Sequence, residues 1–261
     1  MPLAEGTRHA EDPLERGRAL YLDLLKNVLL NLIYRDPQIG SDSTESFDLD
    51  KRLQGLDWPR DAHTMVGYHR LNNLQQCCEQ AVWDKVPGDF VECGVWRGGA
   101  SILMRGLLAA CGEHGRKVVL FDSFRGLPPP NPGDFPEDEG DTLHTFDALA
   151  VPLETVRETF ARYGLLDDQV VFVKGWFRDT LQDAPVHRIA VLRLDGDMYE
   201  STWQALTSLY PKLSPGGFVI VDDYGAIPAC RSAVDAYRVE FGISEPLTEI
   251  DWTGVYWRKP F

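Results

Sequence analysis

Short apolar runs alternate with segments of helical period from residue 90 onward, and this alternation limits the possible folds more than any other feature. The runs FVEC, VVLFD, VVFV, IAVLRLD and GGFVIVDD have the length and β-branched content of buried strands. The segments between them repeat apolar residues every three or four positions. This pattern predicts an α/β domain built on a parallel sheet, and the closing LTEIDWTGVYWRK predicts an antiparallel strand pair.

The N-terminal part of the chain is less regular. Residues 1–16 are expected to be disordered, residues 35–48 to form a loop and residues 71–84 a helix. No repeat or linker divides the chain, so one domain is expected over 17–261, with 17–85 as a helical cap, dimer and lid region and 86–261 as the core. A long helix over 18–34, expected to cover the core or a second subunit, has one apolar face formed by Leu20, Leu24, Leu25, Val28, Leu32 and Ile33.

Composition excludes several classes of protein. A net charge of −14 over 261 residues argues against non-specific binding to nucleic acid or to an anionic membrane. Five cysteines without a CxxC pair suit reduced thiols better than disulfides or zinc. The N-terminus lacks the apolar core of a signal peptide, and NVLLNLIY is too short to span a bilayer. A soluble cytoplasmic protein is therefore expected, with no nucleic-acid or membrane partner.

A glycine-rich turn, ECGVWRGGAS, follows the first predicted strand. Gly94, Gly98 and Gly99 allow a sharp turn and a close approach of backbone to ligand. Their spacing differs from the GxGxxG of dinucleotide sites and matches the ExGxxxGG form of proteins that bind S-adenosylmethionine. Asp122 ends the next strand, where a carboxylate can bind both ribose hydroxyls. Together with Glu92, this order favours S-adenosylmethionine over a merely tight turn.

Two later predicted strands end in carboxylates, Asp195 with Asp197 beyond it and Asp222 with Asp223. If these strands are neighbours, their ends lie side by side. A single Asp after a strand is commonly a turn residue or a helix cap, but four acids together repel unless a cation joins them. Oxygen ligands suit Mg²⁺ rather than zinc. The sequence therefore predicts a magnesium site at Asp195, Asp222 and Asp223.

A metal ion beside a methyl sulfonium suits O-methyl transfer. Binding to Mg²⁺ acidifies a hydroxyl and orients it for in-line attack. Asp197 is expected to accept the proton, although an ordinary Asp, with a pKa of about 4, is a weak base, so the metal must supply most of the acidification. His144, in DTLHTFD, is the rival base and reads equally well as a surface-loop histidine.

Long blocks of the sequence resemble the macrocin O-methyltransferase family from about Leu20 to Trp257. They include LYLDLLK, DWPRDAHTMVGYHRLNNLQQC, ECGVWRGGA in place of ETGVWRGGA, YGLLDDQV, GWFRDTL, LRLDGDMY, LSPGGFVIVDDY and GVYWR. The resemblance implies a class I methyltransferase fold: a Rossmann-like, mostly parallel seven-stranded sheet with helices on both faces and an added N-terminal helical region. It also implies S-adenosylmethionine, Mg²⁺, a homodimer or higher homo-oligomer, and methylation of a deoxysugar hydroxyl on a glycosylated antibiotic.

The family also implies roles for individual residues. Aspartates matching Asp195, Asp222 and Asp223 carry its metal, and the one matching Asp197 is its proposed general base. Thr64 and Met65 match positions that close over the cofactor. The residues expected to bind the cofactor are Thr64, Met65, Glu92, Gly94, Arg97, Gly98, Gly99, Ser101, Asp122, Ser123, Trp176, Asp179 and Asp195.

The sequence leaves open alternative roles for two residues and alternative functions for the protein. Trp176 and Asp179, expected beside the adenine, read equally well as core packing and a helix cap. The loop 127–146 departs most from the family, so the acceptor sugar is not fixed. A catechol would chelate the metal as well as a sugar does, and a non-catalytic partner protein is a further alternative. A nicotinamide oxidoreductase is disfavoured by the glycine spacing.

Overall fold

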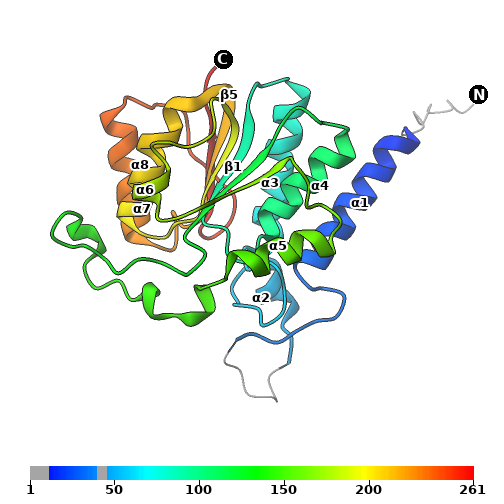
Figure 1. Ribbon diagram of the computed structural model, residues 1–261, viewed down its shortest axis with the longest axis horizontal. Coiled ribbons are helices and arrows are strands. Elements are labelled where there is room, and N and C mark those ends of the chain that lie inside the picture. The colour runs from blue at the N-terminus through cyan, green and yellow to red at the C-terminus, as the bar shows by residue number, and fades with distance from the viewer. Residues whose placement is uncertain (1–11, 40–45) are drawn as a thin grey trace, which may run out of the picture.

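A seven-stranded sheet runs through the centre of the computed structural model, which describes residues 12–39 and 46–261 (Figure 1). Its strands lie in the order β3-β2-β1-β4-β5-β7-β6, and β7 runs antiparallel to both neighbours whereas the other pairs are parallel. The predicted mostly parallel sheet and its closing antiparallel pair are confirmed. The strands are β1 (Asp89–Cys93), β2 (Val118–Asp122), β3 (Val170–Lys174), β4 (Ile189–Leu194), β5 (Leu213–Val221), β6 (Thr248–Glu249) and β7 (Val255–Arg258).

Helices cover both faces of the sheet, with α6, α7 and α8 on one side and α1, α3 and α4 on the other (Figure 1). Short 3-10 turns occupy Pro136–Asp138, Leu143–Thr145, Asp147–Leu149 and Tyr210–Lys212. The α-helices are α1 (Pro13–Leu29), α2 (Leu49–Gln54), α3 (Gly67–Trp83), α4 (Gly99–Cys111), α5 (Leu153–Arg162), α6 (Phe177–Thr180), α7 (Tyr199–Leu209) and α8 (Pro228–Glu240).

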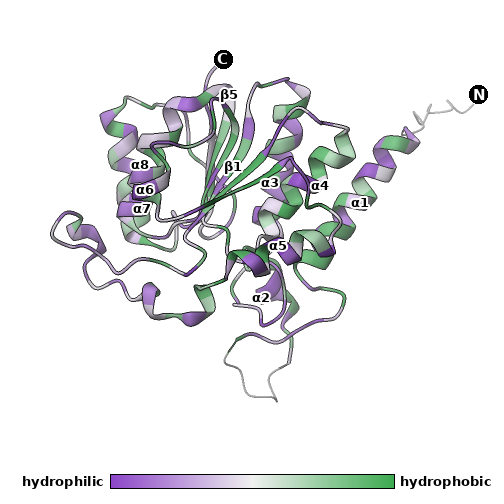
Figure 2. Ribbon diagram, viewed as in Figure 1, coloured by the Kyte–Doolittle hydropathy of each residue, from purple (hydrophilic) through white to green (hydrophobic). Residues whose placement is uncertain are grey.

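The strands supply the core because successive side chains point to opposite faces. On β2, Val118 and Leu120 pack toward the helices α1, α3 and α4, whereas Val119 and Phe121 pack toward α7 and α8. Figure 2 shows the strands as mainly hydrophobic and the helices as mixed. Each buried apolar side chain contributes about 1.5–3 kcal/mol, so this double-sided burial holds the strand ends of the site in place.

Helix α1 begins earlier than the sequence suggested. Asp12 accepts a hydrogen bond from the N–H of Leu14 (3.1 Å), and Pro13 occupies the first turn, where a proline loses no helical hydrogen bond. The predicted disorder of residues 1–16 is therefore wrong over residues 13–16, whereas residues 1–11 lie outside the described residues. The helix ends at Leu29, so its predicted extension to residue 34 was too long.

The buried face of α1 matches the predicted one only in part. Leu25 is buried as predicted, together with Leu22 and Leu29, whereas the predicted Leu20 and Leu24 are 62% and 55% exposed. Among the described residues, no helix is both long and apolar enough to cross a membrane. Of the predicted loop 35–48, residues 40–45 lie outside the described residues, and the rest contains one bridge from Gln38 to Pro59.

Candidate active site

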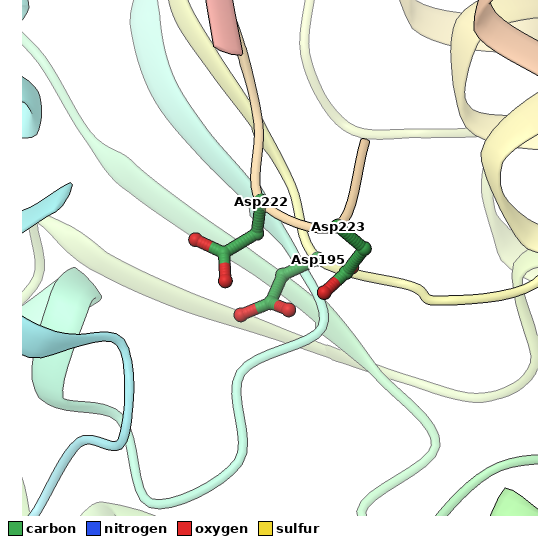
Figure 3. A group of neighbouring side chains, drawn as sticks. All are labelled: Asp195, Asp222 and Asp223. Carbon is green, nitrogen blue, oxygen red and sulfur yellow. The ribbon is translucent and has the colours of Figure 1, made fainter. Parts of the chain in front are cut away.

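Three carboxylates meet where two neighbouring strands end. β4 and β5 pair in parallel with Leu194 opposite Val221, so Asp195 and Asp222 leave the sheet side by side. One oxygen from each of Asp195, Asp222 and Asp223 lies within 4.8 Å of the others (Figure 3). The juxtaposition expected from the sequence is therefore present, at the carboxyl edge where parallel sheets bind ligands.

A buried arginine lies directly beneath these carboxylates. The Arg193 guanidinium, on β4, forms ion pairs with Glu92 (2.8 Å), Asp195 (2.7 Å) and Asp222. Arg70 of α3 pairs with the other oxygen of Asp222 and with Asp251 (3.0 Å). The sequence analysis missed both arginines, although a charge inside the apolar run IAVLRLD was a visible signal for Arg193.

The remaining negative charge is not balanced by side chains. In the part of the chain that the structure describes, no cationic side chain forms an ion pair with Asp197 or Asp223. Burial and then neighbouring carboxylates raise the pKa of Asp195 to about 6, that of Asp197 to about 8, and that of Asp223 well above its usual value. An oxygen-only donor set with excess negative charge fits a divalent cation such as Mg²⁺.

Asp197 has an unusual backbone conformation. Its φ is 60°, in the left-handed region that disfavours residues with a side chain. Its backbone N–H donates to Asp223 Oδ2 (3.2 Å), and its side chain borders the cavity. Such conformations cost about 1–3 kcal/mol and concentrate at functional sites.

The glycine turn after β1 touches the chain leaving β4. Gly94 has a φ of 87°, and a Cβ placed there would lie 1.7 Å from the carbonyl oxygen of Asp195. Only glycine fits this approach, which brings the predicted cofactor turn and the carboxylates to one cavity. Glu92, two residues earlier on β1, accepts from the Ser101 hydroxyl, and burial raises its pKa to about 7.

Asp122 is held in a fixed orientation at the end of β2. Its Oδ2 accepts from the N–H of Val95 (2.7 Å) and its Oδ1 from the N–H of Phe124 (2.6 Å). Burial raises the pKa of Asp122. Both oxygens retain lone pairs for a ligand hydroxyl, and the carboxylate borders the cavity.

One cavity unites most of the predicted site residues. Its walls also include Arg70, Arg193, Glu200 and Trp252, which the sequence analysis did not single out. The acceptor-side loop, defined as residues 127–149, contributes Leu127, Pro128, Leu143 and Leu149. The predicted residues on the wall are Thr64, Met65, Glu92, Gly94, Asp122, Ser123, Trp176, Asp195, Asp197, Asp222 and Asp223.

Several predicted ligands do not reach this cavity. Arg97 instead donates to the carbonyls of Pro59 (3.1 Å) and Ala62 (2.8 Å), so it holds the segment that leads into Thr64. His144, the rival base, is exposed on its 3-10 turn and does not border the cavity. The other predicted site residues that do not border the cavity are Gly98, Gly99, Ser101 and Asp179.

Those residues have other surroundings. The N–H of Gly99 donates to His63 O (3.0 Å), and a Cβ on Gly99 would lie 2.5 Å from that oxygen. Gly98 has a φ of 89° at the start of α4, and Ser101 binds Glu92 inside the fold. Asp179 is exposed on α6. These glycines and Ser101 shape the turn and do not border the cavity.

Comparison with known proteins gives a consistent result. The model of the macrocin-O-methyltransferase (TylF) family matches residues 18–259. The 8-demethyl-8-(2,3-dimethoxy-alpha-L-rhamnosyl)-tetracenomycin-C 4'-O-methyltransferase of Streptomyces olivaceus is 58% identical over 94% of each chain. The mycinamicin III 3''-O-methyltransferase of Micromonospora griseorubida is 52% identical over 93% of this chain and 97% of that one. The demethyldecarbamoylnovobiocin O-methyltransferase of Streptomyces niveus is 50% identical over 92% and 94%.

Two solved structures superpose on the fold described above. The O-methyltransferase NovP superposes with a TM-score of 0.89 at 50% identity, covering 94% of this chain and 100% of that one. The calicheamicin methyltransferase CalS11 superposes with a TM-score of 0.57 at 21% identity, covering 99% of each chain. The second similarity concerns the fold alone.

Proposed function

The chain belongs to the macrocin O-methyltransferase family, and we propose that it methylates a deoxysugar hydroxyl on a glycosylated natural product, with S-adenosylmethionine as donor and Mg²⁺ bound. The observation that carries this proposal is the cavity shared by the glycine turn and the carboxylates of Asp195, Asp222 and Asp223. The name of the Streptomyces olivaceus relative includes a rhamnosyl group, a deoxysugar, in its acceptor.

The cofactor would lie along the glycine turn. S-adenosylmethionine supplies a methyl group on a sulfonium. Gly94 would let the backbone approach it closely, and the remaining lone pairs of Asp122 would accept hydrogen bonds from the ribose hydroxyls. Trp176, on the cavity wall, has the Arg125 guanidinium 4.7 Å from its ring centroid and offers a flat surface to an adenine.

The metal would be held by Asp195, Asp222 and Asp223. Mg²⁺ bound there would make an acceptor hydroxyl more acidic and orient it. Arg70 and Arg193 each pair with one oxygen of Asp222 and hold its carboxylate in a fixed orientation, so the ligand oxygens are ordered in advance.

Asp197 would accept the proton of the acceptor hydroxyl. Without a metal ion, burial and the neighbouring carboxylates raise its pKa to about 8. Mg²⁺ on those carboxylates would offset their repulsion and favour the ionised form of Asp197, which is the form that accepts a proton. Its backbone hydrogen bond to Asp223 holds it beside the metal ligands. Leu143 and Leu149 of the acceptor-side loop border the same cavity and would keep water away from the reacting atoms.

The test is methyl transfer to a defined acceptor. The protein is incubated with S-adenosylmethionine, Mg²⁺ and the rhamnosyl tetracenomycin named for the Streptomyces olivaceus relative, and a mass gain of one CH₂ unit is sought. Transfer that stops when the metal is chelated supports the proposal. Transfer to a catechol and not to the glycoside would support the phenolic alternative. No transfer and no binding of S-adenosylhomocysteine would overturn the proposal.

The expected homodimer stays a prediction. Leu20 and Leu24 on the outer face of α1 give it an apolar surface to pair with. A monomeric mass by light scattering would contradict it.

A further inference from the structure

One buried carboxylate fastens the acceptor-side loop to the start of α7. Asp138, on the 3-10 turn Pro136–Asp138, is 2% exposed. Its Oδ1 accepts from the N–H of Tyr199 (2.7 Å) and its Oδ2 from the N–H of Glu200 (3.0 Å). The first residues of a helix have N–H groups without helical partners, and Met198, the residue before α7, cannot cap them. Asp138 therefore caps this helix from 61 residues upstream.

Ring contacts strengthen the same attachment. Phe135 packs against Tyr199 with ring centroids 6.2 Å apart, and Tyr199 stacks on Trp203 at 5.9 Å. The C-terminal end of the loop is fixed separately, because Trp96 Nε1 donates to Ala148 O (2.8 Å). The loop is thus tied to α7 near its middle and to the glycine turn at its C-terminal end.

The first turn of α7 fixes the positions of Asp197, the proposed base, and of side chains that line the cavity. Two residues before Tyr199, Asp197 sits in its left-handed conformation, held from the other side by Asp223. On the helix itself, Glu200, Ser201 and Gln204 border the cavity. A shift of this turn would move both the proposed base and one wall of the cavity.

We propose that Asp138 is a positioning residue for methyl transfer, which couples placement of the acceptor-side loop to placement of Asp197. Asp138 does not border the cavity, so it acts through the α7 turn rather than on the substrate. The proposal rests on the proposed function only in treating Asp197 as the base. The coupling itself is a property of the fold and needs no acceptor to be measured.

The first arm of the test is hydrogen exchange on the full chain loaded with S-adenosylhomocysteine and Mg²⁺. Asp138→Asn keeps the side chain's size but removes its charge and one acceptor. Segments 136–149 and 195–202 are expected to exchange about tenfold faster, as for loss of a helix cap, whereas β1 and α4 are unchanged. The matched control is Glu139→Gln on the exposed neighbouring residue, which should exchange like wild type.

A second variant distinguishes the specific Asp138 contact from a general loss of order in the loop. Trp96→Phe removes the hydrogen bond to Ala148 at the C-terminal end of the loop, so segment 143–149 should exchange faster while segment 195–202 keeps its protection from exchange. Protection of 195–202 that survives in Asp138→Asn would overturn the proposal. Loss of that protection in Trp96→Phe as well would overturn it too, because the effect would not be specific to the Asp138 contact.

The second arm is kinetic and uses the rhamnosyl tetracenomycin acceptor. The value of kcat is normalised to the concentration of sites that bind S-adenosylhomocysteine. On this basis Asp138→Asn should lower kcat about 10- to 100-fold, whereas the affinity of the variant for S-adenosylhomocysteine should change less than about twofold. A purely structural role would lower the number of binding sites and leave kcat per site unchanged, which would overturn the proposal. If the wild-type protein does not methylate this acceptor, the proposed acceptor is wrong. The hydrogen-exchange experiment then still tests whether Asp138 couples the loop to the first turn of α7.

Discussion

Replacing Asp223 with Asn should stabilise the metal-free protein and abolish its response to Mg²⁺. Asp223 is 9% exposed, and burial followed by repulsion from Asp197, Asp195 and Asp222 raises its pKa. An acid whose pKa is raised in the folded state loses stability as the pH rises from its unfolded pKa through its folded one. Asn has the same size and cannot ionise, so it avoids that loss.

The direction follows from the raised pKa of Asp223. Wild type pays for ionising this buried acid as the pH rises and the Asn variant does not, so metal-free Asp223→Asn should have the higher Tm at about pH 8. In wild type, Mg²⁺ at about a hundred times its Kd should add about 2.7 kcal/mol, or about 5–10 °C.

The assay is scanning calorimetry of protein loaded with S-adenosylhomocysteine, in chelator and in Mg²⁺. Wild type in chelator should lose stability as the pH rises from about 6 to about 8, whereas Asp223→Asn should lose less. Asp183→Asn is the matched control, because Asp183 is exposed and away from the cavity. It should behave like wild type in both buffers.

Two results would refute this reasoning. A lower Tm for metal-free Asp223→Asn would mean that the carboxylate is stabilised by a partner rather than repelled by its neighbours. An undiminished Mg²⁺ response in the variant would mean that the ion binds elsewhere, and the assignment of Asp195, Asp222 and Asp223 as its ligands would fall.

Three further substitutions test the other roles. Asp197→Asn should lower kcat about 10²- to 10⁴-fold while calorimetry shows unchanged S-adenosylhomocysteine affinity, and a smaller loss would contradict its role as base. Arg193→Met leaves three carboxylates without their shared cation and should cost about 3–5 kcal/mol in urea unfolding; an unchanged midpoint would show that the ion pairs add nothing. His144→Ala should keep the wild-type kcat, and a loss of about 100-fold would restore it as the base.

The strand ends could be predicted from the sequence because their signal is local. A run such as IAVLRLD has strand length and composition by itself, and parallel pairing then brings Asp195 beside Asp222. The face of α1 could not be predicted in this way. On α4, Gly106 leaves room for Leu25, since a Cβ there would lie 2.5 Å from the Leu25 side chain. Leu25 was on the predicted face, but packing against the distant helix α4, rather than the number of leucines on a stripe, decides that Leu22 and Leu29 are buried with it.

The missed residues share a different cause, since each acts on a distant part of the chain. Asp138 lies in an acid-rich loop that gives no sign of the helix it caps. The only local signal was at the helix, where Met198 occupies the position of a capping residue. Similarly, Arg70 lies on a helix more than a hundred residues before its partner Asp222, so only the tertiary fold joins them.

The pairing of β1 with β4 also fixes when the site can form during synthesis. Phe90 of β1 pairs with Val191 of β4, which is translated about a hundred residues later. At about 5–20 residues per second, β1 and its glycine turn leave the ribosome about 5–20 s before the strand that carries Asp195. The carboxylates of Asp195, Asp222 and Asp223 therefore join the glycine turn only after the C-terminal half has been made, so the complete site forms late in synthesis.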